Sequence, residues 1–428
     1  MYHKSNGLPF CIFFQNNCCI MLLAGPLFTL KGATRRLVFV DFRQFNNGEN
    51  PMNKKLISLA VAAAITAPAA ALADATFYGK AHISIDWFQI EDQTEDLYEG
   101  WALSRGKIGK GNSRASRLGV KGSEDLGAGL KAIYQVEFGI PLAGERDYNI
   151  INGDQGGLKM RNTYVGLKGG FGTILAGRYD SPLKQSTVRL ELFNDTMADY
   201  AGAVGFDDNR FDSTVAYLSP SYGGFQLAAA IVPGSSSSFG DYINRESESL
   251  IAGHSIAAAY QNGPWHAGVA YEALDESLSS DKAMVNLANE AFEAGLIDAD
   301  DLADVNALHG NTDDSTKWRA GVGVSDWNNL YLSTLYEHQK NANFYKDTEA
   351  DIWQAQAGYS FGNNMVKAMY GKRSMDSDSE ADTQTWAFGL DHAFSKRTKA
   401  YALYTNVDAE GTDEGDWKGF SLGMIHNF

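Results

Sequence analysis

The sequence is poor in several kinds of residue, and each shortage excludes a class of protein. It contains three cysteines, all near its start, and only nine prolines in 428 residues. Basic residues number 36 against 52 acidic ones, which argues against a nucleic-acid partner because a phosphate backbone binds a basic surface. No apolar run after residue 73 approaches the roughly 20 residues that a membrane helix needs. Glycine (44), tyrosine (20) and phenylalanine (23) are abundant, a mixture that suits strands and turns.

An export signal occupies residues 52–73. Two lysines follow Met52, an apolar segment spans 56–65, and Ala71-Leu72-Ala73 matches a cleavage site. A transmembrane anchor is the alternative, but the run is short and Pro68 interrupts it. We expect the mature chain to begin at Asp74, with 29 basic and 50 acidic residues and without the three cysteines Cys11, Cys18 and Cys19. It is therefore an exported protein without disulfides.

Residues 1–51 precede this signal, which is an unusual arrangement. The stretch Gly48-Glu49-Asn50-Pro51 can be encoded by a purine-rich sequence shortly before the Met52 codon, which resembles a bacterial ribosome-binding site. We expect residues 1–51 to be a mistranslated leader. The alternative is a genuine extension, and the nucleotide sequence at these codons distinguishes the two.

Alternation of side chains predicts strands throughout the mature chain. Residues 77–88, FYGKAHISIDWF, alternate with a period of two, as a strand with two different faces does. Sixteen segments of this kind occur, mostly near the 9–11 residues that a tilted strand needs to cross a bilayer. They are 76–89, 113–122, 129–140, 159–169, 171–178, 211–219, 223–232, 253–261, 264–273, 315–325, 328–339, 350–361, 364–373, 383–394, 397–407 and 416–428.

The connections between these segments alternate strictly between short and long. Tight turns such as PSYG, QNGP and GNN take every second place. The others are long and polar: 90–112, 141–158, 179–210, 233–252, 274–314, 340–349, 374–382 and 408–415. This pattern is typical of an outer-membrane β-barrel, with short periplasmic turns and long external loops. A soluble barrel has no reason to sort its loops by length, and an even number of strands puts both ends on the periplasmic side.

The two faces of each strand indicate which side meets lipid. In the first strand we expect Ile83 and Ile85 to face lipid, and Lys80, His82 and Asp86 to face a wet lumen. The segments TWAFGLDHAF and FSLGMIHNF also place large apolar groups on one face, with aromatic residues near the strand ends. Closing the sheet pairs every backbone group, which hydrocarbon requires.

One long connection has a different periodicity. Residues 279–310 have apolar side chains at three-to-four spacing, which predicts helix. Calcium binding is an alternative interpretation of the acidic tract at 298–301. The spacing of these residues does not match the EF-hand pattern, and the tract lacks the glycine of that pattern. We interpret it as the solvated face of a helix.

Several stretches resemble the trimeric general porins of Gram-negative outer membranes. They are FYGKAHISI, SRASRLGVKGSEDLGAGLKAIYQVEFG at 113–139, RNTYVGLKGGFGTILAGRYDSP at 161–182, STVAYLSPSYGGF at 213–225 and the terminal Phe428. The resemblance implies an all-β, 16-stranded antiparallel transmembrane barrel through which ions and small hydrophilic solutes diffuse. It also implies a homotrimer in the outer membrane, in contact with lipid and lipopolysaccharide, and a third external loop, here 179–210, that folds inward and narrows the pore.

The resemblance assigns basic residues to the wall of the constriction. They are Lys80 in YGK, Arg117 before LGVKG, Arg178 closing LAGR, and Arg210 at the start of the next strand. Alternation adds Lys121, which points the same way as Arg117 and away from lipid. Arg161 has two interpretations, in the lumen or at the periplasmic rim.

Acidic residues of the inward loop are expected to face these bases. The enterobacterial loop motif is absent from VRLELFNDTMADYAGAVGFDDNR, so the choice of Glu191, Asp195 and Asp199 depends on position alone. The alternative for each is that it points into solvent or bonds the loop backbone. Opposed charges across a narrow wet gap orient polar solutes and set ion preference. The acidic balance favours cations at the mouths, and the basic constriction opposes this preference.

Other functions have weaker support in the sequence. GKIGKGNS at 106–113 lacks the lysine of a phosphate loop, which is Asn112 here, and no G-x-S-x-G or H-E-x-x-H motif occurs. We therefore expect no enzyme activity, cofactor or metal. A substrate-specific channel, a non-conducting adhesin and a barrel enzyme stay open as alternatives, and conductance distinguishes them.

Overall fold

The computed structural model describes residues 75–91, 97–104, 114–143, 158–234, 249–293, 298–376, 382–409 and 416–428. The expected leader at 1–51 and signal peptide at 52–73 lie outside these ranges. Within the described ranges, no helix combines the length and the apolar character that crossing a membrane demands.

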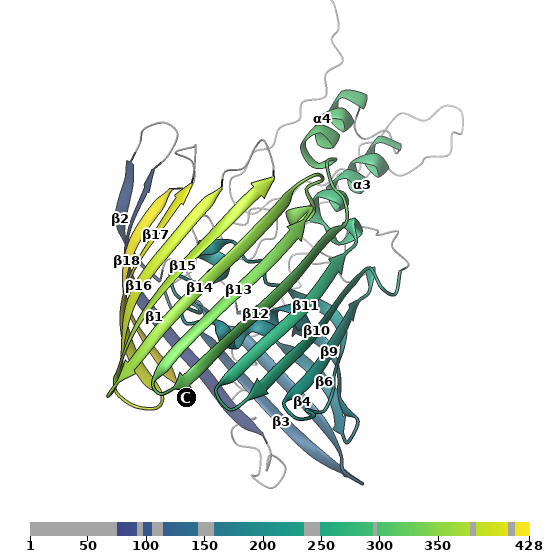
Figure 1. Cartoon of the computed structure of the whole chain (residues 1–428). Helices are drawn as coiled ribbons and strands as arrows, with labels where there is room; N and C mark the ends of the chain where they lie inside the picture. Colours follow the sequence, from purple (N-terminus) through teal and green to yellow (C-terminus); the bar gives the residue numbers. More distant parts are fainter. Residues whose placement is uncertain are drawn as a thin grey trace, which may run out of the picture. The chain divides into compact units, whose positions relative to one another are not determined.

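The strands form one antiparallel sheet that closes on itself (Figure 1). Strand β1 (Thr76–Glu91) pairs on one side with β18 (Trp417–Asn427) and on the other with both β2 (Leu97–Leu103) and β3 (Arg117–Gly127). In the same way, β5 (Lys159–Met160) and β6 (Thr163–Gly169) both pair with β4 (Leu130–Gly139). Counting each of these two broken strands once reduces the 18 segments of the sheet to 16. The predicted 16-stranded antiparallel barrel is confirmed.

The remaining elements complete the barrel in chain order. The strands are β7 (Gly172–Asp180), β8 (Arg210–Leu218), β9 (Phe225–Val232), β10 (Gly253–Asn262), β11 (Trp265–Leu274), β12 (Ser315–Trp327), β13 (Leu330–Lys340), β14 (Glu349–Phe361), β15 (Asn364–Asp376), β16 (Thr383–Ala393) and β17 (Thr398–Ala409). The helices are α2 (Pro182–Thr187), α3 (Ser280–Glu293) and α4 (Ala299–His309), with short turns η2 (Val188–Leu190), η3 (Tyr200–Val204), η5 (Glu276–Leu278) and η6 (Ala342–Phe344).

One strand of the sheet is not among the sixteen predicted segments. Strand β2 lies inside the connection predicted at 90–112 and extends the sheet beside β1. Its alternation is hard to recognise because Glu99 shares a face with Trp101 and Leu103, both of which are exposed. A polar residue in an otherwise apolar set hides the period of two that identifies a strand.

Helices α3 and α4 lie within the segment 279–310. Asp298 is the N-cap of α4, and its side chain accepts hydrogen bonds from the backbone N–H groups of Asp300 and Asp301, each at 2.9 Å. The side chain of Asp301 in turn accepts a hydrogen bond from the backbone N–H of Asp298, which completes a capping box. The acidic tract therefore has a structural explanation in the start of a helix.

The two faces of the barrel wall reverse the usual distribution of polarity. In β1, His82 and Asp86 are buried at 1% and 0% exposure, whereas Ile85 on the other face is 51% exposed. The same alternation recurs in β18, where Ser421 is buried and both Leu422 and Met424 are exposed. Apolar side chains outside and polar ones inside are what a barrel in hydrocarbon requires. The predicted orientation of Ile83, Ile85, His82 and Asp86 is confirmed.

The C-terminal residue closes the ring at the tight-turn end. The backbone N–H of Phe428 donates to the carbonyl of Gly79 at 3.0 Å, and the Gly79 N–H donates back at 2.9 Å. The Phe428 ring lies so close to Gly79 that a Cβ added there would be 2.3 Å from it. The YGK glycine is therefore required by this contact.

Candidate functional site

The connection between β7 and β8, residues 181–209, lies inside the barrel. Ser181 caps α2 by accepting a hydrogen bond from Lys184 N at 3.2 Å, and Pro182 starts the helix without an N–H to satisfy. Beyond the helix, Leu190, Phe193 and Tyr200 are almost completely buried. They belong to an apolar cluster with inward-facing residues of β13 to β17, among them Leu335, Ile352, Met369 and Leu403. This loop is therefore packed on the inner wall.

Hydrogen bonds from the wall fix the path of the loop backbone. Ser333 Oγ donates to Leu190 O at 2.8 Å, and Lys367 Nζ donates to Leu192 O at 3.0 Å. Gln356 Oε1 accepts from Leu192 N at 2.7 Å. Because a buried backbone group without a partner is costly, these inward-facing polar side chains make the loop's position inside the barrel possible.

Two bases on β12 hold the end of the loop. Arg319 is fully buried and lies 2.5 Å from Glu337 Oε2 and 2.8 Å from Asp208 Oδ1. Lys317 pairs with Asp207 and also with Glu272, at 3.1 Å. Neither base is among the site residues predicted from the sequence. The signal was present, because they alternate with the outward-facing Trp318 in STKWRAGVG and so point into the lumen.

The tip of the loop reaches the wall formed by β1 and β3. Asp195 Oδ2 lies 2.7 Å from Lys80 Nζ and 2.8 Å from Arg117 Nη2. Lys80 and Arg117 are direct cross-strand partners, so both side chains point to the same face. Burial alone would raise the pKa of Asp195, but the positive charges of Lys80 and Arg117 outweigh it and hold that pKa below its usual value. The structure thus brings together three of the predicted site residues.

The other two predicted acids bind groups other than wall bases. Asp199 accepts from Asp195 N at 2.7 Å and from Ala201 N at 3.0 Å, so it shapes the loop tip. Burial and the negative charge of Asp195 raise the pKa of Asp199 to about 6. Glu191 accepts from Phe193 N at 3.2 Å and from Gln356 Nε2 at 3.4 Å, and burial raises its pKa well above the usual value. Both follow the alternative interpretation, bonding the loop backbone.

Arg178 and Arg210 pair with acids of the neighbouring strands. Arg178 forms an ion pair with Asp212 and donates to Met160 O at 3.0 Å. Arg210 lies 2.8 Å from Asp180 Oδ1 and donates to Asn162 Oδ1, also at 2.8 Å. The structure does not bring either guanidinium to Glu191, Asp195 or Asp199. Position along a strand cannot reveal which acid a long arginine side chain reaches.

Lys121 and Arg161 have different environments on the same side of the barrel. Lys121 Nζ lies 5.0 Å from the centre of the Tyr78 ring, and Lys121 is exposed. It is four residues closer to the tight-turn end than Arg117, on the same strand and face. Arg161 lies 2.8 Å from Glu137, which is itself bonded by Tyr78 OH at 2.9 Å. Lys121 therefore lines the lumen beyond the loop tip.

This arrangement combines a wet lumen with an internal loop of fixed position. The loop is bound to β12–β17 by apolar packing and buried ion pairs, and its tip carries an acid that meets two bases from β1 and β3. A passage past such a loop has charged groups of both signs along its walls. Charged and polar linings of this kind select among ions and hydrated solutes.

The chain is similar to proteins of a known family. The family model described as Gram-negative porin matches residues 58–412. Major outer membrane protein P.IB of Neisseria meningitidis serogroup B is 30% identical over 390 residues, covering 88% of this chain and 100% of the relative. P.IB of Neisseria gonorrhoeae is 29% identical over 367 residues, covering 82% of this chain and 92% of the relative.

Solved structures with the same fold are more distant in sequence. The anion-selective porin from Comamonas acidovorans has a TM-score of 0.59 at 21% identity, covering 83% of this chain and 99% of that one. Salmonella typhi OmpF, in complex with daunomycin, has a TM-score of 0.58 at 15% identity, covering 83% and 97%. At these identities the likeness establishes the fold.

Proposed function

Because the chain belongs to the Gram-negative porin family, we propose that the loop at 181–209 and the bases Lys80 and Arg117 form the constriction of its channel. The protein is an outer-membrane porin, a water-filled barrel for passive diffusion of ions and small hydrophilic solutes. Its relatives are porins, which are channels and not enzymes. The single observation that carries the proposal is the shared contact of Asp195 with Lys80 and Arg117.

A pair of charge variants on one strand tests this assignment. Arg117→Gln and Lys121→Gln each remove one positive charge from the lumen face of β3, but only Arg117 touches the loop tip. In a planar bilayer with a salt gradient, Arg117→Gln should shift the reversal potential toward cations more than Lys121→Gln. It should also change the single-channel current, because Asp195 loses one of its two partners. Equal shifts from the two variants would place the constriction elsewhere.

We propose that Glu191 and Asp199 act on the constriction through the loop's shape, because both accept hydrogen bonds from loop backbone. Arg178 and Arg210 are proposed to contribute positive charge near the β7–β8 wall while paired with Asp212 and Asp180. Arg161, beside Glu137, belongs to the same set. Neutralising Arg210 should alter ion preference less than neutralising Arg117, which the same reversal-potential measurement checks.

The active assembly is proposed to be a homotrimer in contact with outer-membrane lipid and lipopolysaccharide. One structure of similar fold is the trimer form of OmpT from Vibrio cholerae, with a TM-score of 0.51. The outward face of β1 and β2 carries exposed apolar side chains, Ile83, Ile85, Trp101 and Leu103, that a neighbouring subunit could cover. Mass measurement of the detergent-solubilised protein tests this. A monomer that conducts as a single unit would contradict the trimer and leave the channel assignment intact.

Processing at Ala73 is also proposed, with residues 1–51 absent from the exported protein. The basic start, apolar segment and Ala-x-Ala site support this. N-terminal sequencing of the protein from outer membranes should give Asp74 as the first residue. A protein that begins upstream of Met52 would show that the extension is real.

A further inference from the structure

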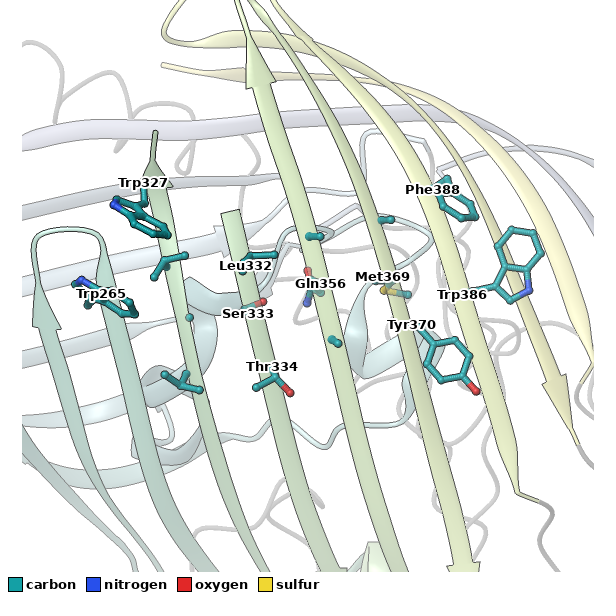
Figure 2. Close-up of a pocket in the computed structure, with 16 residues that line it drawn as sticks. Trp265, Trp327, Leu332, Ser333, Thr334, Gln356, Met369, Tyr370, Trp386 and Phe388 are labelled. Atoms are coloured by element: carbon teal, nitrogen blue, oxygen red, sulfur yellow. The ribbon is translucent and has the colours of Figure 1, made fainter. Parts of the chain in front are cut away.

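A hollow lies on the outward face of the barrel, over β11 to β16. It has a volume of about 870 Å³, and Figure 2 shows the side chains that line it. Its floor consists of small side chains on three adjacent strands: Thr334 on β13, Ala355 and Ala357 on β14, and Ala368 on β15. Thr334 is directly opposite Ala355, and Ala357 is directly opposite Ala368. The hollow exists because four neighbouring outward positions carry small residues.

Large side chains form the two sides of this groove. Trp265 and Trp327 stand on one side with ring centres 6.2 Å apart, and Tyr370, Trp386 and Phe388 stand on the other (Figure 2). Trp265 is 51% exposed and Phe388 is 59% exposed, so these rings project from the wall. Adjacent strands are about 4.8 Å apart, so a floor three strands wide gives space about as wide as two hydrocarbon chains.

The hydroxyl groups around the groove are occupied by the protein itself. Thr334 Oγ1 donates to Gln354 O at 3.0 Å, and Tyr370 OH donates to Gln384 Oε1 at 2.9 Å. Ser333, at the base of the groove, donates inward to Leu190 O of the loop. The surface that these residues offer to an occupant is therefore carbon. A ligand that needed hydrogen bonds would lose them here.

We propose that this groove holds the acyl chains of a phospholipid as a discrete binding site. The groove lies on the face that an outer-membrane barrel turns to hydrocarbon, so its occupant comes from the bilayer. The position of the groove along the membrane normal indicates which leaflet supplies the lipid. Trp265 follows the tight turn at 263–264 and Trp327 precedes the turn at 328–329, which places both rings at the periplasmic interface, where Trp is enriched. A lipid with its headgroup at that interface would run its chains over Ala357 and Ala355.

Packing supplies the attraction at such a site. Within a bilayer, apolar groups gain little from leaving lipid, and close van der Waals contact decides which surfaces associate. A hollow that stayed empty would cost its lining those contacts. The backbone floor and the projecting rings are held by the sheet, so a chain in the groove contacts protein on three sides instead of one. This site is independent of the proposed constriction, because it depends only on the barrel's place in the membrane.

Native mass spectrometry of the protein extracted from outer membranes tests the proposal. Ala357→Phe places a ring in the groove, whereas Ala258→Phe adds the same ring to the outward face of β10, between Leu227 and Val269 and outside the groove. The wild type and Ala258→Phe should retain phospholipid through detergent washing, and Ala357→Phe should retain it several-fold less. Equal retention in the two variants, or none in the wild type, would overturn the proposal.

A second measurement covers the case in which Ala357→Phe fails to fold. Phospholipid brominated on its acyl chains is titrated into the micellar wild-type protein, and tryptophan fluorescence is recorded. The expected result is saturable quenching that is reduced in Trp386→Phe, whose replaced ring borders the groove. Quenching that rises without saturation would mean ordinary bilayer contact and reject a discrete site. Absence of quenching together with cross-links between copies at Trp327→Cys would assign the groove to a second copy of the chain.

Discussion

Lys80 Nζ lies 2.7 Å from Asp195 Oδ2, although 115 positions separate the two residues in the chain. This contact joins the first strand of the barrel to the tip of the loop inside it. Arg117, opposite Lys80 on β3, binds the same carboxylate oxygen. The tip is therefore attached to one wall while the body of the loop is packed on the other. A loop attached at both ends and at its tip keeps a constant position inside the barrel.

Replacing Asp195 with Asn should move the reversal potential toward anions. The substitution removes one negative charge and leaves Lys80 and Arg117 without their shared partner. The ammonium group of Lys80 and the guanidinium group of Arg117 would then attract anions in the lumen. Single-channel recording should also show noisier open current, because the tip loses its attachment. Asp304→Asn, on the exposed surface of α4, is the control with the same charge change and no expected effect. Identical behaviour of the two variants would remove Asp195 from the constriction.

Arg319→Met should destabilise the barrel strongly. The guanidinium is fully buried and pairs with Glu337, which is also fully buried, so its loss leaves an uncompensated charge. Breaking such a pair costs about 3–5 kcal/mol in other proteins. Thermal unfolding followed by circular dichroism measures the loss, with the exposed Lys346→Met as control. The double variant Arg319→Met, Glu337→Gln should recover part of it, because Asp208 still lacks its partner in that variant. A double variant as unstable as the single one would show that the charge of Glu337 is not the source of the loss.

The stability of the loop should increase on mild acidification because of Asp199. Its pKa is raised from 3.8 to about 6, mainly by burial and then by the charge of Asp195. Between these values the folded protein binds a proton that the unfolded chain does not, so the free energy of unfolding rises as pH falls through about 6. Asp195, with a lowered pKa, contributes a loss only below 3.8.

The unfolding midpoint of the wild type relative to that of Asp199→Asn should therefore rise between about pH 7.5 and about pH 5. Glu191, whose pKa is also raised by burial, keeps part of the slope in that variant. The midpoint of the wild type relative to that of the double variant Asp199→Asn, Glu191→Gln should rise further over the same interval. A midpoint difference between the wild type and Asp199→Asn that shrinks on acidification would contradict the raised pKa of Asp199.

Gly371→Ala should reduce the single-channel conductance. A Cβ at this position would lie 2.5 Å from Val204 of the loop, so the loop must move off the wall and toward the lumen. Gly170→Ala is the matched control, because a Cβ there meets no atom within 4 Å. Conductance unchanged in Gly371→Ala, with the fold retained, would show that Val204 yields without displacing the loop.

The barrel could be predicted from the sequence because its signal is local. The alternation around Ile83 and Ile85 reports the two environments of the wall directly, and the lengths of the connections give the order of the strands. Strand β2 failed this test only because Glu99 lies on an apolar face. Predicting the barrel does not require knowing which polar partner each inward side chain binds.

The contacts of the proposed constriction could be predicted only in part because they cross the barrel. Strand parity placed Lys80 and Arg117 on the lumen face, but nothing local distinguishes Asp195 from Asp199 in NDTMAD. The difference arises from the loop backbone, where Asp195 adopts a φ of 60° and Asp199 caps the η3 turn. The anchors Lys317 and Arg319 lie more than 100 positions from the loop acids Asp207 and Asp208 that they bind. Such pairings depend on how the loop folds back.

The wall is only one residue thick, so successive side chains of a strand alternate between its two faces. In β14, Gln354 and Gln356 face the barrel interior while Ala355 and Ala357 face the groove. Deleting one residue near the start of this strand would exchange those sets, sending two amides into hydrocarbon and two methyl groups into the channel. A single-residue insertion or deletion in a strand therefore exchanges the side chains that face lipid with those that face the lumen. Changes of length can accumulate in the long connections, which have no such alternation to preserve.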